Sequence, residues 1–346
     1  MKRILPVVFL LLALTSCSSQ PAGPQTLTVM THDSFAATDT LIKSFEQANN
    51  ARLTFIKGGD AGAVLNKAIL SKPAPLADVL YGVDNTFLSR ALGADIYESY
   101  DSPALKKIPA EFQLDPTQRA LPVDYGDVCI NYDKGYFSAH QLPVPTSLEE
   151  LTRPEYKGLL VTENPATSSP GLAFLLATIK HFGEPDYLGY WKDLRQNGLQ
   201  VVDGWETAYY TNFSGSSGKG LQPMVVSYGT SPAAEVMDAQ TPVPDAPTAS
   251  ILGPDTCFRQ IEFVGILKGT RQLALARRFV DFMLSSEFQA DMPAQMFVFP
   301  VVPNIALPEA FTKYAQGPAQ PASLAPDVIA SNRDAWIQAW TDAVLK

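Results

Sequence analysis

The chain has 346 residues, of which 46% are apolar and 18% charged, a composition that excludes an intrinsically disordered protein and is ordinary for a chain with a large buried core. Its 35 acidic and 26 basic side chains give a formal net charge of −9, which argues against a general nucleic-acid binder because such proteins neutralise phosphates with basic residues. Three cysteines and three histidines are too few for zinc-finger chemistry, and the length predicts about two domains.

The amino terminus has the features of a secretory signal. Lys2 and Arg3 precede an apolar run over 4–14 that is too short to span a bilayer. The run ends in Leu14-Thr15-Ser16-Cys17, which resembles the bacterial lipobox, in which the cysteine is lipidated and becomes the mature N-terminus. An ordinary signal peptide that contains a cysteine is the alternative. We expect a lipoprotein signal peptide over 1–16, lipidation at Cys17, and a flexible tether over 17–26.

The rest of the chain predicts alternating strands and helices. In chain order we expect strand 27–31, helix 37–48, strand 52–56, a helix from 60 that ends by 73, strands 78–82, 128–132 and 158–162, helices 171–181 and 186–195, strands 199–202, 224–228 and 261–267, and helices 273–284 and 327–344. The Pro-rich stretch 241–254 is expected to be a surface loop. This alternation favours an α/β fold with mainly parallel sheets.

Two cysteines remain in the expected exported body. In an oxidising compartment Cys129 and Cys257 favour one disulfide, which would close a loop of more than a hundred residues. Two buried free thiols are the alternative.

Polar and aromatic residues follow several of the predicted strands. Ligands of open α/β sheets bind beyond the carboxyl ends of the strands, so these loops form the candidate site. They contain His32, Asp33, Asp60, Asp84, Asn85, Ser168, Trp205, Tyr228 and Ser231. Carboxylates beside aromatic rings suit a cation with a flat ring, and hydroxyls at the start of a helix suit a phosphate or hydroxyl tail.

Strings in these loops and elsewhere resemble the thiamine-binding proteins of bacterial ABC importers, which belong to the type II solute-binding family. The strings are Thr31–Ala36, Gly82–Asn85, Val123–Gly126, Thr167–Leu172, Gly204-Trp205, Val226–Ala233 and Phe282–Gln289, and the similarity runs from about residue 26 to the C-terminus. The resemblance implies a type II periplasmic-binding-protein fold, in which two α/β lobes joined by a two-strand hinge close on the ligand. The implied lobes are 27–124 with 267–346, and 125–266 including the hinge strands. Cys129 and Cys257 would lie in the two hinge strands, which is why we prefer the disulfide.

The resemblance also implies roles for individual residues. Trp205 would stack on the pyrimidine ring, and Asp60 would pair with the cationic or amino part of thiamine. Ser168 and His32 would face the hydroxyethyl or phosphate end. The complete candidate ligand-binding set is His32, Asp33, Asp60, Asp84, Asn85, Ser168, Trp205, Tyr209, Tyr228, Ser231 and Phe297.

This chain departs from the family pattern at three of these loops. Ala234 replaces a second stacking Tyr, Phe297 replaces a Trp, and His32 replaces a Tyr. The pocket is therefore expected to be less aromatic than the pattern, so a related pyrimidine, a thiamine phosphate or another cation is an alternative ligand. Asp60 also precedes a predicted helix and can be read simply as its N-cap.

The function that the resemblance implies is a periplasmic or cell-surface receptor, anchored by lipid, that hands thiamine to an ABC permease. It would act as a monomer, without cofactor, metal or nucleic acid. A ferric-ion receptor is one alternative, because Tyr209-Tyr210 are neighbouring tyrosines of the kind that iron-binding relatives use. A thiamine-degrading enzyme on the same fold is another, and it would need a free cysteine facing the cleft. The sequence has no nucleophile-elbow, zinc-protease or P-loop motif, so we expect a binding protein.

Overall fold

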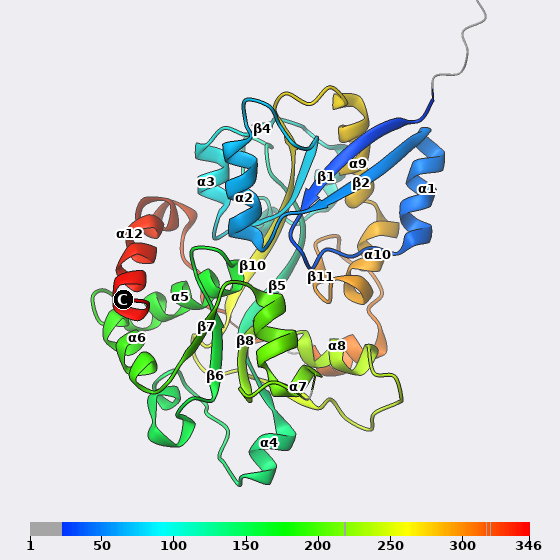
Figure 1. Cartoon of the computed structure of the whole chain (residues 1–346). Coiled ribbons are helices and arrows are strands. Elements are labelled where there is room, and N and C mark those ends of the chain that lie inside the picture. Colours follow the sequence, from blue (N-terminus) through cyan, green and yellow to red (C-terminus); the bar gives the residue numbers. More distant parts are fainter. Residues whose placement is uncertain (1–22, 218, 316, 319) are drawn as a thin grey trace, which may run out of the picture.

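The computed structural model describes residues 23–217, 219–315, 317–318 and 320–346. The expected signal peptide, Cys17 and most of the expected tether lie outside the described residues. In the described part of the chain, no helix combines the length and apolar character that a bilayer span requires. Figure 1 shows an upper and a lower α/β lobe connected by two long strands, β5 (Leu121–Asp133) and β10 (Phe258–Leu267). The predicted fold of two α/β lobes joined by two strands is confirmed.

The remaining elements alternate along the chain as expected. The other strands are β1 (Gln25–Thr31), β2 (Ala51–Lys57), β3 (Val79–Asp84), β4 (Tyr97–Glu98), β6 (Leu160–Glu163), β7 (Gln200–Val202), β8 (Met224–Tyr228), β9 (Thr248–Ile251) and β11 (Phe299–Pro300). The helices are α1 (Asp39–Asn49), α2 (Ala61–Leu70), α3 (Leu88–Gly93), α4 (Lys134–Ala139), α5 (Ser169–Phe182), α6 (Tyr187–Gln196), α7 (Ser214–Ser217), α8 (Ser231–Met237), α9 (Leu273–Met283), α10 (Ser286–Gln295), α11 (Glu309–Tyr314) and α12 (Pro326–Val344).

One sheet runs through both lobes in the order β2-β1-β3-β10-β5-β8-β6-β7. β1 is parallel to β2 and β3, and β6 is parallel to β7 and β8, whereas β10 is antiparallel to β3 and β5, and β5 is antiparallel to β8. The sheet is therefore mixed, and the expectation of mainly parallel strands holds only for its two outer parts. The centre is antiparallel because β5 and β10 cross between the lobes in opposite directions.

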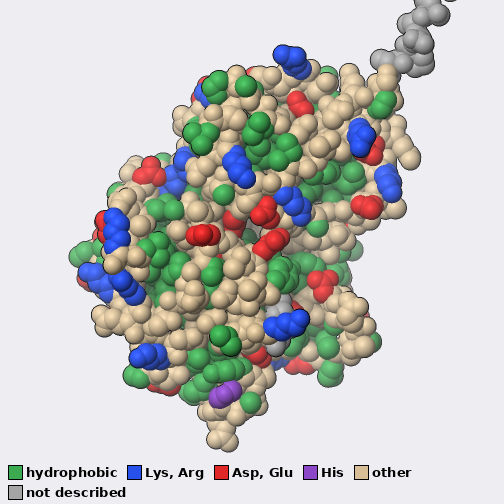
Figure 2. Space-filling view, viewed as in Figure 1, with side chains coloured by type: hydrophobic (Ala, Val, Ile, Leu, Met, Phe, Trp, Pro, Cys, Tyr) green, Lys and Arg blue, Asp and Glu red, His purple; other side chains and the backbone are tan. Residues whose placement is uncertain are grey.

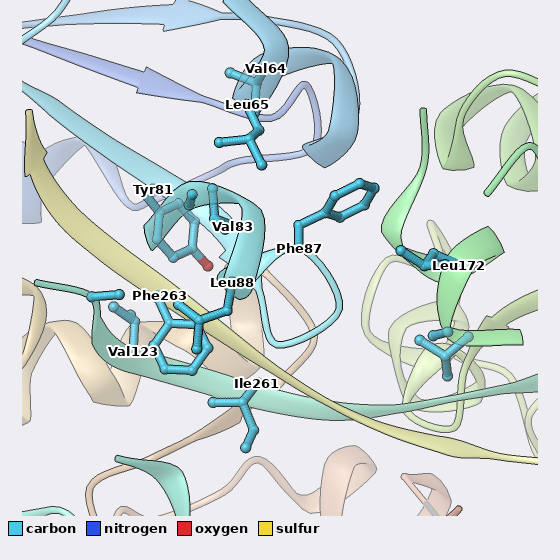
Figure 3. Close-up of a cluster of buried hydrophobic side chains, with 14 of the residues drawn as sticks. Val64, Leu65, Tyr81, Val83, Phe87, Leu88, Val123, Leu172, Ile261 and Phe263 are labelled. Atoms are coloured by element: carbon cyan, nitrogen blue, oxygen red, sulfur yellow. The ribbon is translucent and has the colours of Figure 1, made fainter. Parts of the chain in front are cut away.

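The upper lobe has a continuous apolar core. Every residue of β3 is buried, as expected for a strand covered on both faces. Figure 3 shows Val64 and Leu65 of α2 above Tyr81 and Val83 of β3, with Phe263 of β10 beneath them. Because β10 also belongs to the hinge, the packing of this core fixes the direction in which the hinge strands leave the lobe.

Several elements were not predicted from the sequence, and β9 and α10 are two of them. The Pro-rich stretch 241–254, expected to be a loop, contains β9, which pairs antiparallel with β5. Prolines flank this short strand but do not interrupt it, so it is compatible with their missing N–H groups. α10 contains Pro293, which obscures its helical pattern. The aromatic stripe Phe279, Phe282 and Phe288 lies in the core, as expected.

The last helix contacts both lobes. The ring of Trp340 on α12 meets Trp191 of α6 edge-on at 5.4 Å, and Trp336 Nε1 donates to Glu184 Oε1 at 2.5 Å. The Arg333 guanidinium lies 5.2 Å from the ring centre of Phe87 in the upper lobe. The expected assignment of 267–346 to the upper lobe stays a prediction, and α12 itself packs mainly on the lower one (Figure 1).

Candidate functional site

A cavity of about 220 Å³ lies between the two lobes. Acidic side chains gather near the middle of the face that Figure 2 shows, in the region between the lobes. The lining residues come from both lobes and from the segment after α10: His32, Ser34, Ala36, Asp60, Ser169, Pro170, Trp205, Glu206, Tyr209, Tyr210, Tyr228, Thr230, Ser231, Ala234, Glu262, Gln295, Met296, Phe297 and Val298. None of these described lining residues is a lysine or an arginine. The wall is therefore aromatic and acidic.

The aromatic wall is built in the lower lobe around Trp205. Its indole Nε1 donates to Ser227 Oγ at 2.8 Å, which fixes the orientation of the ring. One face of the indole stacks on Tyr209, with ring centres 5.0 Å apart and planes 17° apart, and Tyr228 meets it edge-on at 6.2 Å. Tyr209 belongs to a π-helical segment, Thr207–Asn212. Such segments often occur at functional sites, and this one brings Tyr209 beneath the indole.

Asp60 connects the upper lobe to the lower one. As the N-cap of α2, its Oδ1 accepts from the Ala61 N–H at 2.7 Å, while its Oδ2 accepts from the Trp205 N–H, 145 residues along the chain, at 2.9 Å. Burial raises the pKa of Asp60, and the hydrogen bonds from the Trp205 and Ala61 N–H groups oppose this rise. A carboxylate has about four lone-pair positions, so two hydrogen bonds leave Asp60 able to contact a ligand as well.

A second acidic group forms the base of the pocket. His32 Nε2 lies 3.6 Å from Glu262 Oε1, and both side chains are nearly buried. Burial is the largest single influence and opposes both charges. The attraction and hydrogen bond between the two groups, together with neighbouring Asp60 and Asp33 for His32 and Tyr81 and Asp124 for Glu262, outweigh it, so the pKa of His32 is raised and that of Glu262 is lowered. The two groups therefore form an ion pair. The His32 ring lies against Gly82, where an added Cβ would collide with imidazole Cδ2.

Tyr81 and Asp124 extend this group into the hinge. The Tyr81 hydroxyl lies 2.6 Å from Asp124 Oδ2 and 2.9 Å from Glu262 Oε2. Burial and repulsion from Glu262 raise the pKa of Asp124 well above its ordinary value. The Tyr81 hydroxyl is the donor to both carboxylates, and because it carries one proton it serves only one of them at a time. β3, β5 and β10 thus hold the His32–Glu262 pair in place from below.

The structure brings seven of the expected ligand-binding residues to the pocket wall. These are His32, Asp60, Trp205, Tyr209, Tyr228, Ser231 and Phe297. The structure also adds lining residues that sequence reasoning missed. Glu206 and Tyr210 lie beside expected residues and are exposed, and Thr230 presents a buried hydroxyl without a protein partner. Glu262 was missed because it lies inside β10, whereas the expected site residues were taken from the loops that follow the strands.

Four expected residues do not line the pocket. Asp33 Oδ1 accepts from the Gly59 N–H at 2.9 Å in the adjacent loop, and Ser168 is fully buried behind Asp60. Asp84 caps the turn that leads to α3, and its pKa is raised to about 7 by burial. The Asn85 side chain bonds the Arg259 and Ile261 backbone, each at 3.0 Å, and so fastens β10. These hydrogen bonds of Asp33, Asp84 and Asn85 are thus with other parts of the protein and hold its loops and strands in place.

The two cysteines lie away from the pocket wall. The structure joins Cys129 of β5 to Cys257, directly before β10, in the expected disulfide. Both are buried at 1% exposure, and neither is among the described lining residues. The disulfide therefore ties the two hinge strands at their lower-lobe end.

The chain is similar to a known protein family and to solved structures of binding proteins. The family model for bacterial extracellular solute-binding proteins matches residues 74–322. The thiamine-binding periplasmic protein of Salmonella typhimurium is 31% identical, and the alignment covers 99% of each chain. A solved periplasmic thiamin-binding protein is 29% identical with a TM-score of 0.80, covering 93% of this chain and 96% of that one. A ferric-binding protein from Campylobacter jejuni shares the fold. It is 18% identical, with a TM-score of 0.74, and the alignment covers 92% of this chain and 99% of that one.

Proposed function

Because this chain belongs to the bacterial extracellular solute-binding proteins, in the branch of the periplasmic thiamine-binding proteins, we propose that it captures thiamine and delivers it to an ABC importer. A periplasmic solute-binding role follows from the family itself. The observation that carries the thiamine proposal is the pocket wall, which combines carboxylates and aromatic rings and has no lysine or arginine among its described residues. Thiamine is a cation with two flat rings, and such a wall attracts both features.

The geometry supports one arrangement of the ligand. Tyr209 covers one face of the Trp205 indole, so the pyrimidine ring would stack on the other face. The cationic ring or the amino group would pair with Asp60, on the upper-lobe side of the pocket. The hydroxyethyl end would face His32 and the unpartnered Thr230 hydroxyl. Ser169, which lines the pocket at the start of α5, would take the place that we expected for the buried Ser168.

All three departures from the family pattern, at His32, Ala234 and Phe297, lie on the pocket wall. Ala234 and Phe297 both line the cavity at positions where the pattern has larger aromatic side chains. The small side chain of Ala234 leaves more space in the cavity than an aromatic ring would. A phosphate ester of thiamine or a related aminopyrimidine is therefore included in the test.

Two further parts of the proposal rest on other observations. The string Leu14-Thr15-Ser16-Cys17 supports a lipid anchor at Cys17, so the body would be held at the membrane beside the permease. The disulfide and the absence of both body cysteines from the described pocket wall support a receptor rather than a thiamine-degrading enzyme with a cysteine nucleophile.

The site favours thiamine over ferric iron. The Tyr209 hydroxyl donates to Glu235 at 2.6 Å, and burial and the Glu235 charge raise the pKa of Tyr209 well above its ordinary value. Iron needs this oxygen as a phenolate, which such surroundings oppose. Among the described residues, no group of three or more His, Cys, Asp or Glu side chains is placed to hold a metal ion.

Calorimetric titration of the soluble body with thiamine, its mono- and diphosphate, the free aminopyrimidine, ferric citrate and a polyamine tests the proposal. We expect thiamine to bind more tightly than about 10 μM, or about −7 kcal/mol. Asp60→Asn should weaken binding by about 10- to 100-fold because a charge-assisted contact is lost. The matched control is Asp203→Asn, an exposed carboxylate two residues from Trp205 that does not line the pocket. Failure of every thiamine compound to bind below that limit would refute the ligand assignment.

A further inference from the structure

The first turn of α2 is where the two lobes touch at the edge of the pocket. The Gly62 N–H donates to the Thr167 carbonyl at 3.0 Å, next to the Asp60–Trp205 hydrogen bond described above. α2 belongs to the upper lobe, whereas Thr167 and Trp205 lie in the loops after β6 and β7 of the lower lobe (Figure 1). Thr167 Oγ1 donates to the Asp203 carbonyl at 2.7 Å, which ties these two loops together. The hydrogen bond from Gly62 to Thr167 forms only when α2 lies directly against the lower lobe.

Gly62 is the residue that allows so close an approach. A Cβ at this position would lie 2.8 Å from the Thr167 carbonyl oxygen, 2.9 Å from that of Ala166 and 2.9 Å from Phe87 Cζ. Two of these three atoms are backbone atoms of the opposite lobe, which cannot rotate away. Figure 3 shows Phe87 extending from the upper lobe toward Leu172 of α5, so its ring also fills the space between the lobes.

The backbone of α2 gives no other reason for a glycine here. Glycine inside a helix is unfavourable relative to alanine, and Gly62 does not have the positive φ that would call for it. Gly189, in the interior of α6, provides a contrast, because an added Cβ there meets nothing within 4 Å. The missing side chain of Gly62 therefore serves the contact between the lobes.

We propose that Gly62 is a positioning residue for ligand capture, because its missing side chain lets α2 seat on Ala166 and Thr167 as the lobes close. This inference rests on the proposed function, since thiamine is the ligand that would close the lobes. Closure also brings the Asp60 carboxylate onto the Trp205 N–H. The same carboxylate would pair with the ligand cation, so ligand binding and lobe closure stabilise each other through Asp60. A permanent packing role for Gly62 is the competing explanation.

The test compares wild type, Gly62→Ala and the matched control Gly189→Ala. We expect Gly62→Ala to bind thiamine at least tenfold more weakly, which corresponds to about 1.4 kcal/mol, chiefly through faster dissociation. Small-angle scattering should show a smaller thiamine-induced decrease in its radius of gyration. The ligand-free variant should melt no lower than wild type, because alanine favours the helix and the lobes are free to open. Gly189→Ala should bind and contract like wild type.

The outcomes separate the possible failures. Wild-type affinity together with full contraction in Gly62→Ala would overturn the inference. A lower melting temperature of the ligand-free variant would show that the contact is permanent packing, and would also overturn it. If wild type itself binds no thiamine compound, the proposed function fails and this inference fails with it. If wild type binds thiamine and Gly62→Ala behaves identically, only this inference fails.

Discussion

Removing the hinge disulfide should destabilise the protein strongly while leaving its binding site in place. Cys129 and Cys257 are 128 residues apart in the sequence, and the bond between them constrains the unfolded chain. In the chain-entropy model, closing a loop of this length contributes about 5 kcal/mol at 25 °C. We therefore expect the variant Cys129→Ala/Cys257→Ala to lose about 5 kcal/mol of unfolding free energy.

Urea unfolding measures this loss directly, and wild type in a thiol reductant provides the matched control. The two cysteines are 1% exposed, so their replacement by alanine also leaves small cavities, which reduction of the wild type does not. The difference between the double variant and the reduced wild type therefore gives the cavity contribution. Thiamine affinity should stay within about threefold of wild type, because the disulfide acts mainly on the unfolded chain and lies away from the pocket wall.

Two results would refute this reasoning. A loss below about 1 kcal/mol would show that the unfolded chain is already compact at this loop, so that the chain-entropy argument does not apply. Unchanged stability with a large fall in affinity would show instead that the disulfide sets the geometry of the hinge strands in the folded state. The mature body would then need an oxidising compartment for its function rather than for its stability.

Three other measurements address the site and its surroundings. Burial raises the pKa of Asp84 from 3.8 to about 7, so its stabilising contribution to the free energy of unfolding is fully present below about pH 4 and is lost as pH rises through 7. In urea unfolding, Asp84→Asn should remove up to about 4 kcal/mol of this pH dependence. An unchanged pH dependence would contradict the raised pKa of Asp84. Trp205→Phe loses the hydrogen bond to Ser227 but keeps a ring, so it should weaken thiamine binding by about two- to tenfold and Trp205→Ala by more, whereas equal losses would exclude ring stacking. Because burial raises the pKa of Asp60 and a cation prefers the ionised carboxylate, affinity should fall as pH is lowered toward that pKa, and titration of Asp60→Asn should show a flatter profile.

Sequence reasoning found the elements whose pattern is local. His32 after β1, Trp205 after β7 and Tyr228 at the end of β8 line the pocket because strand ends of both lobes face the same cleft. β9 and α10 were missed because prolines obscure their periodicity. The periodicity of apolar residues was therefore sufficient for the elements that were predicted, in which no proline interrupts it, and insufficient in these two proline-containing segments.

Glu262 and Asp84 show where such reasoning stops. Glu262 lies within β10, and it reaches the pocket only because the hinge strand crosses from one lobe to the other there. Asp84 follows a strand end, as the rule requires, yet its Oδ1 accepts from the Thr86 N–H at 3.0 Å and its side chain is buried beneath α3. Spacing along the chain does not show whether a carboxylate after a strand turns toward the cleft or caps the next helix.

Asp60 shows that these two roles are compatible in one side chain. Its Oδ1 caps α2, and its Oδ2 accepts from Trp205 across the cleft, so both carboxylate oxygens are held when the lobes are in contact. Burial makes the charged form costly, as the raised pKa indicates, and two hydrogen bonds do not fully offset that cost. A neutral side chain would serve as an N-cap equally well, since Asn is as good a cap as Asp. The proposed cationic ligand would account for an Asp rather than an Asn at this position, because it would pair with the ionised carboxylate.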